Sequence, residues 1–205
     1  MNYLFKLAPL LTLIPLLFIL IGLYFKWLGV LMFGLFLFYF LFYFFRVPKI
    51  GKSPLHRNPI LAPTYGTVRE IKQIKNYILV SITLSVFDPH LQYVPYNGIV
   101  RKKIYKKGDF KPVYFLEKSQ YNERMVTIFD TDIGDISVSQ IAGMITRRIH
   151  NFARPLQIMR KREHLGFICF GSRVDLLIPK KDNMKIGVNV GERIKGGETV
   201  IAYLK

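Results

Sequence analysis

The sequence predicts a mainly β protein, an antiparallel barrel-sandwich with one covering helix, preceded by an apolar helical hairpin in the membrane. Three observations predict it. Residues 7–45 contain no acidic residue and a single basic one, Lys26, so they form an apolar block. The remainder is rich in short alternating runs of β-branched residues, which are typical of strands. Glycine-containing turns recur between these runs, as they do in small barrels.

The apolar block divides at Lys26 into two runs of 19 residues, 7–25 and 27–45. Each run is long enough, as a helix, to cross about 30 Å of hydrocarbon. A buried core helix is excluded because the block is apolar on every face, and a cleavable signal peptide is disfavoured because no small-residue cleavage site precedes a polar segment. We therefore expect residues 1–45 to be a membrane anchor, either a tight hairpin or one helix that dips and returns.

Basic residues dominate the rest of the chain. Of the formal net charge of +17, residues 46–205 carry +15, because they hold all 13 acidic residues and 28 of the 30 lysines and arginines. Arg46 and Lys49 follow the apolar block, and the positive-inside rule then predicts a cytoplasmic domain at the cell membrane. Such charge suits a solvated surface or anionic lipid headgroups. Nucleic acid is the weaker alternative beside an anchor, since juxtamembrane cations gain about 1 kcal/mol each near an anionic leaflet.

Metal and disulfide chemistry is not indicated. The single cysteine, Cys169, excludes an internal disulfide and any cysteine cluster, and burial in a strand is the expected reason for it. The four histidines, His56, His90, His150 and His164, have no spacing that is typical of a ligand pair. We therefore expect no metal site.

Beyond the apolar block the chain is predicted to continue as a linker and a β domain. Residues 46–60 hold three prolines and a glycine, which indicates a linker. Residues 61–205 then form the domain, in which residues 77–87 and 124–131 alternate as strands do.

One segment of this domain is predicted to be its single helix, residues 135–152. Apolar side chains recur there at helical spacing, and Arg147 and Arg148 come near the end, where the helix dipole favours cations. The apolar stripe comprises Val138, Ile141, Ala142, Ile145 and Ile149.

Glycine turns give the domain a repeating rhythm. Residues 62–71 and 94–110 share the pattern Pro-x-x-Gly-x-Val, and residues 188–204 contain two glycine turns followed by a strand. This rhythm resembles the hairpins of biotinyl and lipoyl carrier domains. A carrier role is not indicated, because no lysine occupies the tip of a Met-Lys-Met or Asp-Lys-Ala turn. The likeness therefore predicts the fold alone.

Gly171 and Ser172 interrupt a pattern that indicates a strand on both sides. One interpretation is a β-bulge or tight turn, the usual reason for a glycine in a strand pattern. The other is a peptide bond that breaks, because a serine hydroxyl can attack the preceding carbonyl and glycine leaves that carbonyl unshielded. Elimination from the resulting ester leaves Ser172 as a pyruvoyl group, whose carbonyl forms a Schiff base with amines and withdraws electrons.

The stretch GFICFGSRVDLLIP, residues 166–179, resembles the processing site of the short-form phosphatidylserine decarboxylases, which are pyruvoyl-dependent proenzymes. Four further stretches resemble other segments of that family, in the same order and spacing from about residue 40 to the end. They are YFFRVPK (43–49), FDPHLQYVPYNGIV (87–100), YNERMVTI (121–128) and VSQIAGMITRRI (138–149). The sequence is thereby identified as a member of that family.

The resemblance implies autocatalytic cleavage between Gly171 and Ser172. The products, fragments 1–171 and 172–205, stay together as a heteromer that could dimerise further. Ser172 becomes the covalent pyruvoyl cofactor, and His90 matches the family histidine that assists cleavage and decarboxylation by proton transfer.

Two residues depart from the family pattern. Tyr65 stands where the family has the Asp of a Pro-Ala-Asp-Gly turn, whose carboxylate completes an Asp-His-Ser relay. A tyrosine offers no carboxylate, although its hydroxyl can donate a hydrogen bond to a substrate carboxylate or phosphate. Tyr93 stands where relatives have Arg or His. Asp88, two residues before His90, is the candidate to replace the missing acid.

The resemblance implies an enzyme, a carboxy-lyase that converts phosphatidylserine, or archaetidylserine with ether-linked chains, to the ethanolamine lipid and CO2. Its expected partners are the phospholipid substrate and an anionic membrane surface, without nucleic acid. Because Tyr65 replaces the family Asp, the alternative is an uncleaved, non-catalytic relative that binds lipid or serves as a membrane scaffold.

Overall fold

A helical unit, Met1–Lys49, precedes a β unit, Ile50–Lys205, in the computed structural model of the chain. The structure describes residues 3–51, 58–144, 149–169 and 172–204. The helical unit contains α1 (Leu4–Leu7), the 3-10 helix η1 (Pro9–Thr12), α2 (Leu13–Tyr24) and α3 (Leu28–Phe44).

The prediction of a membrane hairpin in residues 1–45 was wrong. In the part of the chain that the structure describes, no helix combines the length and the apolar character needed to cross a membrane. Pro9 explains the break in the first run, because proline disfavours a helical conformation for the residue before it, and Ala8 has φ −143° and ψ 53°. With 12 and 17 residues, α2 and α3 reach about 18 and 26 Å, short of ~30 Å of hydrocarbon.

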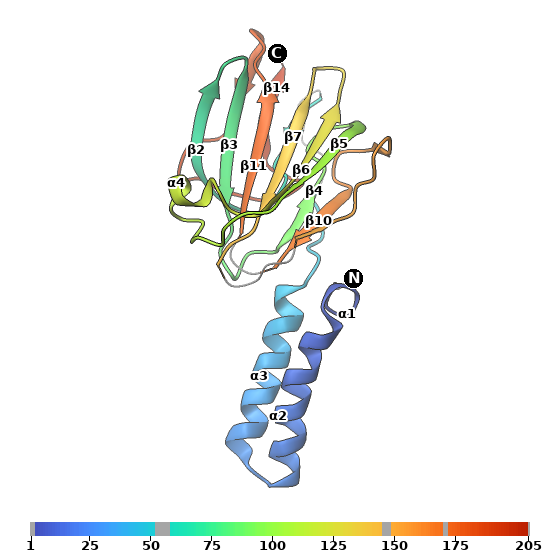
Figure 1. Ribbon diagram of the computed structural model, residues 1–205, viewed down its shortest axis with the longest axis vertical. Coiled ribbons are helices and arrows are strands. Elements are labelled where there is room, and N and C mark those ends of the chain that lie inside the picture. Colours follow the sequence, from blue (N-terminus) through green and yellow to red (C-terminus); the bar gives the residue numbers. More distant parts are fainter. Residues whose placement is uncertain (1–2, 52–57, 145–148, 170–171, 205) are drawn as a thin grey trace. The chain divides into compact units, whose positions relative to one another are not determined.

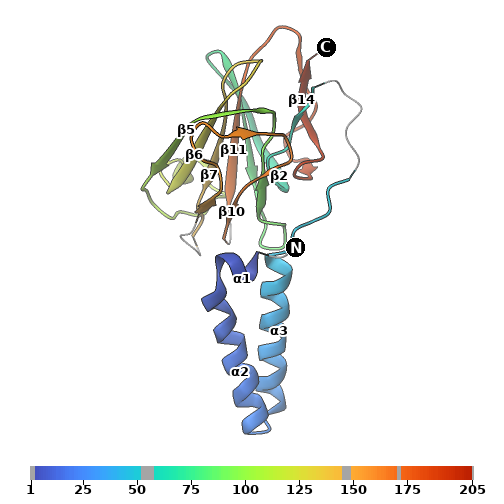
Figure 2. The same ribbon diagram turned by 90° about the vertical axis from the view of Figure 1, so that its right-hand side faces the viewer.

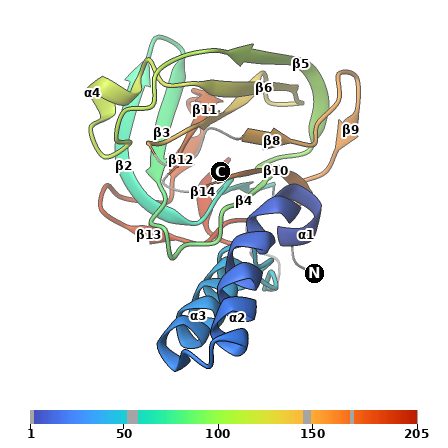
Figure 3. The same ribbon diagram turned by 60° about the horizontal axis from the view of Figure 1, so that its bottom comes forward.

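The β unit is built from three antiparallel sheets (Figure 1). The largest has eight strands in the order β13-β2-β3-β11-β7-β6-β5-β9, and Figure 2 shows β5, β6, β7 and β11 in that order. Figure 3 shows this sheet curling around β8, β10 and β14 without closing, so it is an open curled sheet and not a closed barrel. Two three-stranded sheets, β1-β14-β12 and β4-β10-β8, complete the unit.

The bounds of the elements are as follows. The large sheet comprises β2 (Gly66–Ile74), β3 (Tyr77–Thr83), β5 (Gly98–Lys106), β6 (Arg124–Asp130), β7 (Ile136–Ile141), β9 (Ile158–Met159), β11 (Arg173–Pro179) and β13 (Arg193–Ile194). The small sheets comprise β1 (Ile60–Leu61), β4 (Leu91–Tyr93), β8 (Ile149–Asn151), β10 (His164–Ile168), β12 (Met184–Ile186) and β14 (Val200–Leu204). A short helix, α4 (Leu116–Ser119), lies between β5 and β6 in the chain.

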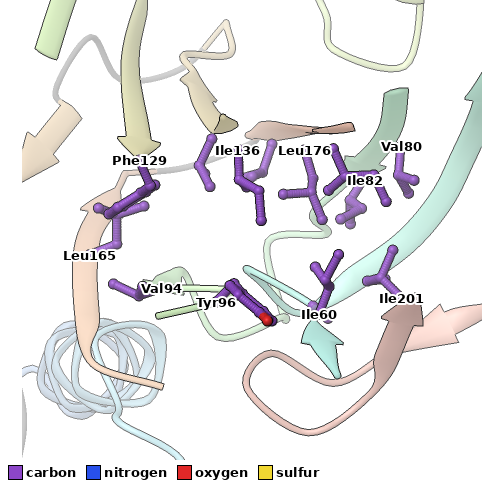
Figure 4. Close-up of a cluster of buried hydrophobic side chains, with 14 of the residues drawn as sticks. Ile60, Val80, Ile82, Val94, Tyr96, Phe129, Ile136, Leu165, Leu176 and Ile201 are labelled. Atoms are coloured by element: carbon purple, nitrogen blue, oxygen red, sulfur yellow. The ribbon is translucent and has the colours of Figure 1, made fainter. Parts of the chain in front are cut away.

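The hydrophobic core lies between the large sheet and the two small ones. Along β11 the fully buried apolar side chains are alternate residues, Val174, Leu176 and Ile178, as the pleat of a strand requires. Figure 4 shows Leu176 on one side of the core, with Ile60 of β1 and Ile201 of β14 on the other. The inner face of β11 is therefore fixed by apolar burial.

The predicted helix over residues 135–152 was also wrong. Ile136–Ile141 is β7, paired with β6 on one edge and β11 on the other, and Ile149–Asn151 is β8. Residues 145–148, with Arg147 and Arg148, lie outside the described part of the chain. Alternate side chains from Ile136 to Gln140 are buried, as in a strand. The apolar residues of this segment fit both the two-residue repeat of a strand and the spacing of a helix. Ladder hydrogen bonds on both edges then decide for the strand.

Leu176→Ala is expected to lower the free energy of unfolding by about 2–5 kcal/mol, because it leaves a cavity in the centre of the core. Leu176 is fully buried, whereas Leu177, its neighbour on the outer face, is partly exposed. Urea unfolding checks this, with Leu177→Ala as the matched control that should lose clearly less. Equal losses in the two variants would contradict the assignment of the inner face.

Candidate active site

One end of the large sheet gathers the residues that the sequence singled out. A row of paired residues crosses β2, β3, β11 and β7 at this end, namely Thr67, Thr83, Arg173 and Ile141. Ser172 lies just beyond this row, directly before β11. On the neighbouring strand, β3 continues past the row into loop 84–90, which ends at His90. The row lies at the lower end of β11 in Figure 1.

Backbone hydrogen bonds tie loop 84–90 to the chain that carries the serine. Leu84 N donates to Ser172 O at 2.9 Å, and Ile168 N donates to His90 O at 3.3 Å. Both ends of the loop are therefore fixed beside the segment between β10 and β11. This brings Ser172 and His90, distant in the sequence, into one region of the fold.

Ser172 is fully buried, and its Oγ has no hydrogen-bond partner among the described residues. Leaving a buried hydroxyl without a partner costs about 1–3 kcal/mol. Such a group is rare in folded proteins and points to a role other than stability. Gly171 lies outside the described residues, and so does the bulge or turn predicted between it and Ser172.

His90 is fully buried just before β4, and its Nδ1 lies 2.7 Å from the backbone oxygen of Asp88. A carbonyl oxygen can only accept, so Nδ1 carries the hydrogen in this bond. In the neutral imidazole the basic lone pair is then on Nε2, the nitrogen that can take up a proton. The ring packs beside Phe167, with 6.4 Å between the ring centroids. The imidazole is therefore held in one tautomer and one orientation.

The carboxylate of Asp88 binds elsewhere. Its Oδ2 accepts a hydrogen bond from Ser85 N at 2.8 Å, and its Oδ1 forms an ion pair with Arg193. The carboxylate is buried, whereas the Arg193 side chain is largely exposed. Asp88 is thus joined to His90 through its backbone oxygen, and its carboxylate fixes loop 84–90 against β13.

The two departures from the family pattern are neighbours in space. The rings of Tyr65 and Tyr93 are 6.4 Å apart between centroids. Tyr93 is fully buried, and its N–H donates to Pro63 O at 2.7 Å, which holds the turn before β2 against β4. His164 packs edge-on against Tyr93, with 5.6 Å between centroids. Tyr65, Tyr93 and His164 therefore form a cluster of aromatic rings at the end of β4.

Arg173 lies on the outer face of the sheet, away from the side that Ser172 faces. Its Nε donates to Asp175 Oδ1 at 2.7 Å and its Nη2 to Asp175 Oδ2 at 2.8 Å, a bidentate ion pair. Its Nη1 donates to Leu116 O at 3.1 Å and to Ser119 Oγ at 3.0 Å. Arg173 therefore holds α4 on the sheet.

A chain of buried amides, which the sequence did not reveal, lies behind His90. Gln92 Nε2 donates to His90 O at 2.7 Å, and Gln140 Nε2 donates to Gln92 Oε1 at 2.8 Å. Asn151 Nδ2 donates to Gln140 Oε1 at 2.8 Å and to Thr127 Oγ1 at 2.9 Å. The strand period of residues 136–141 is the signal that could have placed Gln140 on the buried face.

Two glycines permit the close approaches on which this region depends. A Cβ on Gly166 of β10 would lie 2.2 Å from His150 O and 2.6 Å from Gln140 Nε2. Gly66 has φ +146°, and a Cβ there would lie 2.4 Å from Thr83 O. Any side chain at either position would displace backbone beside the site.

Comparison with known proteins identifies the family. The family model for phosphatidylserine decarboxylase matches residues 37–202. The chain belongs to the phosphatidylserine decarboxylase family. A phosphatidylserine decarboxylase proenzyme of Carboxydothermus hydrogenoformans is 36% identical over 186 residues, which cover 87% of this chain and 85% of the relative.

Two further relatives come from other organisms. A Methanosarcina acetivorans protein, whose assigned name is that of an archaetidylserine decarboxylase proenzyme, is 36% identical over 84% of this chain and 79% of its own length. A phosphatidylserine decarboxylase proenzyme of Bacteroides fragilis is 34% identical over 79% of this chain and 74% of its own length. The predicted family and enzyme class, a carboxy-lyase of this type, are confirmed. The individual roles of Ser172, Gly171, His90, Tyr65 and Asp88 stay predictions.

Gln92→Leu is expected to lower the free energy of unfolding by about 1–3 kcal/mol, because two buried groups, His90 O and Gln140 Nε2, each lose the hydrogen bond to Gln92. Urea unfolding measures this. The control is Gln73→Leu on the exposed end of β2, which should change stability by less than about 0.5 kcal/mol. A Gln92→Leu variant as stable as the control would contradict the described amide chain.

Burial lowers the pKa of His164 below its ordinary value. As the pH falls through about 6.5, the unfolded chain gains a proton at this residue that the folded chain resists, so folding should become less stable. Between pH 8 and pH 5.5 the free energy of unfolding should fall less in His164→Phe than in the wild-type protein. The substitution keeps an aromatic ring beside Tyr93. The same loss in both proteins would exclude His164 as a source of the pH dependence.

Proposed function

We propose that this chain is a proenzyme that cleaves itself between Gly171 and Ser172. Fragments 1–171 and 172–205 then form one pyruvoyl-dependent enzyme, which removes the carboxylate of the serine headgroup of phosphatidylserine or archaetidylserine. The observation that carries the proposal is the Ser172 hydroxyl, fully buried and without a hydrogen-bond partner among the described residues. Family membership supports the decarboxylase class, and the relatives' names contain both lipids and the word proenzyme.

The cleavage step uses groups of this chain alone. Ser172 Oγ attacks the carbonyl carbon of Gly171 while its proton passes to a base, and the C–N bond breaks to give an ester and an amine. Elimination of the Gly171 carboxylate from Cβ, followed by hydrolysis that releases ammonia, leaves the pyruvoyl group. His90 is the proposed base, because the bond from its Nδ1 to Asp88 O leaves the lone pair on Nε2.

The position of Ser172 fits the cofactor that would form from it, since its side chain is enclosed and makes no competing hydrogen bond with the described residues. A pyruvoyl carbonyl condenses with an amine and withdraws electrons from a neighbouring C–CO2 bond. His90 has the complementary task of returning a proton to the headgroup carbon after CO2 leaves. Burial of both residues keeps bulk water away from that carbon.

The orienting function of the family Asp is proposed to lie in the backbone of this chain. Tyr65 has no carboxylate, and the carboxylate of Asp88 binds Ser85 N and Arg193. The backbone oxygen of Asp88 makes the contact to Nδ1 that fixes the imidazole of His90. Asp88 would then support maturation by holding its loop, and the Tyr65 hydroxyl would serve as a donor to the substrate carboxylate or phosphate.

The proposed substrate also implies a lipid surface as a partner. The formal net charge of +17 favours an anionic one. Location at the cell membrane with the β unit on the cytoplasmic side, and dimerisation of the cleaved pair, stay predictions.

Intact mass spectrometry of the purified chain tests the cleavage. We expect two fragments, one ending at Gly171 and one of 34 residues with a pyruvoyl-blocked start, together with CO2 release from phosphatidylserine vesicles. Ser172→Ala should remain one chain of 205 residues without activity, whereas Ser137→Ala, on the outer face of β7, should be cleaved normally. A single uncut wild-type chain, inactive with anionic lipid, would favour the non-catalytic lipid-binding or scaffold alternative.

The same assay separates the two roles that Asp88 could have. Asp88→Asn keeps the backbone oxygen and removes the charge. If the backbone oxygen orients His90, the fragments still form, with a rate reduced by less than about 100-fold. If the carboxylate is the essential acid, no fragments form, as in Ser172→Ala.

A further inference from the structure

We propose that the end of the β unit that carries Ser172 docks on the surface of an anionic lipid bilayer through a rim of exposed aromatic and apolar side chains. The inference rests on the proposed function and adds the surface through which a membrane lipid would reach the site. The rim comprises Phe87, Tyr114, Phe115, Tyr121 and Met144.

Strand register places Phe87 and Met144 at the same end as the serine. Arg173, which directly follows Ser172, pairs with the last residue of β3 and with the last residue of β7. Phe87 lies four residues beyond the end of β3, and Met144 three residues beyond the end of β7. Phe87 and Met144 therefore lie just beyond the end of the sheet at which Ser172 precedes β11.

The other rim residues reach this end from β6 and α4. Arg124, the first residue of β6, pairs with the last residue of β7, so Tyr121 precedes the same row of paired residues. Tyr114 and Phe115 directly precede α4, which Arg173 holds on the sheet. Figure 1 shows α4 toward the lower ends of β2 and β3.

Four of the five rim side chains are aromatic, and each of the five is 56–67% exposed. At the opposite end of the sheet the exposed apolar side chains are aliphatic, namely Ile74, Ile99 and Ile158 at 42%, 44% and 73%. Single exposed apolar side chains are normal on a soluble surface. Several exposed aromatic rings around the end of the sheet that carries the buried Ser172 hydroxyl indicate a surface that binds a partner.

Charge decides which partner the rim fits. Residues 105–121 interleave the rim aromatics with four exposed lysines, against two acidic residues, Asp109 and Glu117. Lys118 Nζ lies 5.2 Å from the ring centroid of Phe115. Rings at headgroup level, with lysine ammonium groups reaching the phosphates, are typical of a membrane interface. The lysines are Lys106, Lys107, Lys111 and Lys118.

Docking by this rim would solve an access problem. The substrate's apolar chains would stay in the bilayer, and only the headgroup would have to enter the protein. A serine headgroup presented at the rim would meet the end of the sheet at which Ser172 and His90 lie.

Single-tryptophan variants test the docking. The chain has one tryptophan, Trp27, so the reporters are built on Trp27→Phe. Phe115→Trp and Tyr121→Trp report on the rim. Ile158→Trp is the matched control, because Ile158 is 73% exposed but pairs with Ile99 near the opposite end of β5. Each full-length variant is mixed with vesicles of phosphatidylcholine and phosphatidylglycerol whose acyl chains carry bromine.

We expect bromine to quench the two rim reporters about twofold and the control hardly at all, because interfacial side chains lie ~5–10 Å inside the headgroup boundary. Vesicles of phosphatidylcholine alone should quench the rim less, and equal quenching would overturn the preference for anionic lipid. Equal quenching at all three positions, or none, would overturn the docking itself. Phe87→Trp repeats the test if a rim variant fails to fold, as judged by circular dichroism.

The remaining outcomes separate this proposal from the proposed function. Rim reporters shielded from iodide without vesicles would mean that another part of the chain or a second copy covers the rim, which would overturn docking on lipid. Rim quenching in a chain that neither cleaves nor releases CO2 would leave the docking standing while the proposed function fails. An active enzyme whose rim reporters are not quenched would support the proposed function and overturn the docking.

Discussion

The pairing of β11 between β3 and β7 is the constraint on which the other features of the β unit depend. Its ladder matches Arg173 with Thr83 and Ile141, and its inner face adds Leu176 to the core. A shift of one residue would turn every side chain of β11 to the other face, moving Ser172 outward and Arg173 into the apolar core. The outer-face hydrogen bonds of Arg173 to Leu116, Ser119 and Ser81 oppose that shift, because the guanidinium would lose all three and would enter an apolar interior with Asp175 as its remaining partner.

Polar groups in the interior of this site fall into two kinds. Gln92, Gln140 and Asn151 satisfy one another, and they hold the backbone of His90 through its carbonyl oxygen. Satisfied amides of this kind rigidify a buried region. The hydroxyl of Ser172, by contrast, has no partner among the described residues. The fold therefore fixes the surroundings of one oxygen atom and leaves that atom available for chemistry.

The wrong predictions have physical causes. Apolar residues in 135–152 recur at helical spacing, but those of 136–141 also alternate with polar ones as in a strand. Pairing with the neighbouring strands β6 and β11 decides between the two conformations. The first apolar run was treated as one helix although Pro9 restricts Ala8, and the chain breaks there into shorter helices. In both cases the conformation depended on one local restriction or on distant partners, which composition does not record.

The sequence by itself determined the family, through motifs in a fixed order, and it determined Ser172 and His90 as the candidates for chemistry. Alternation also located β3 and β6 closely. Only the tertiary structure decided that the carboxylate of Asp88 turns to Arg193 while its backbone oxygen holds His90, and that Tyr65 and Tyr93 are neighbours. The physical reason is that motifs record which residues are present, whereas the direction of a side chain is set by partners that sheet pairing brings from elsewhere in the chain.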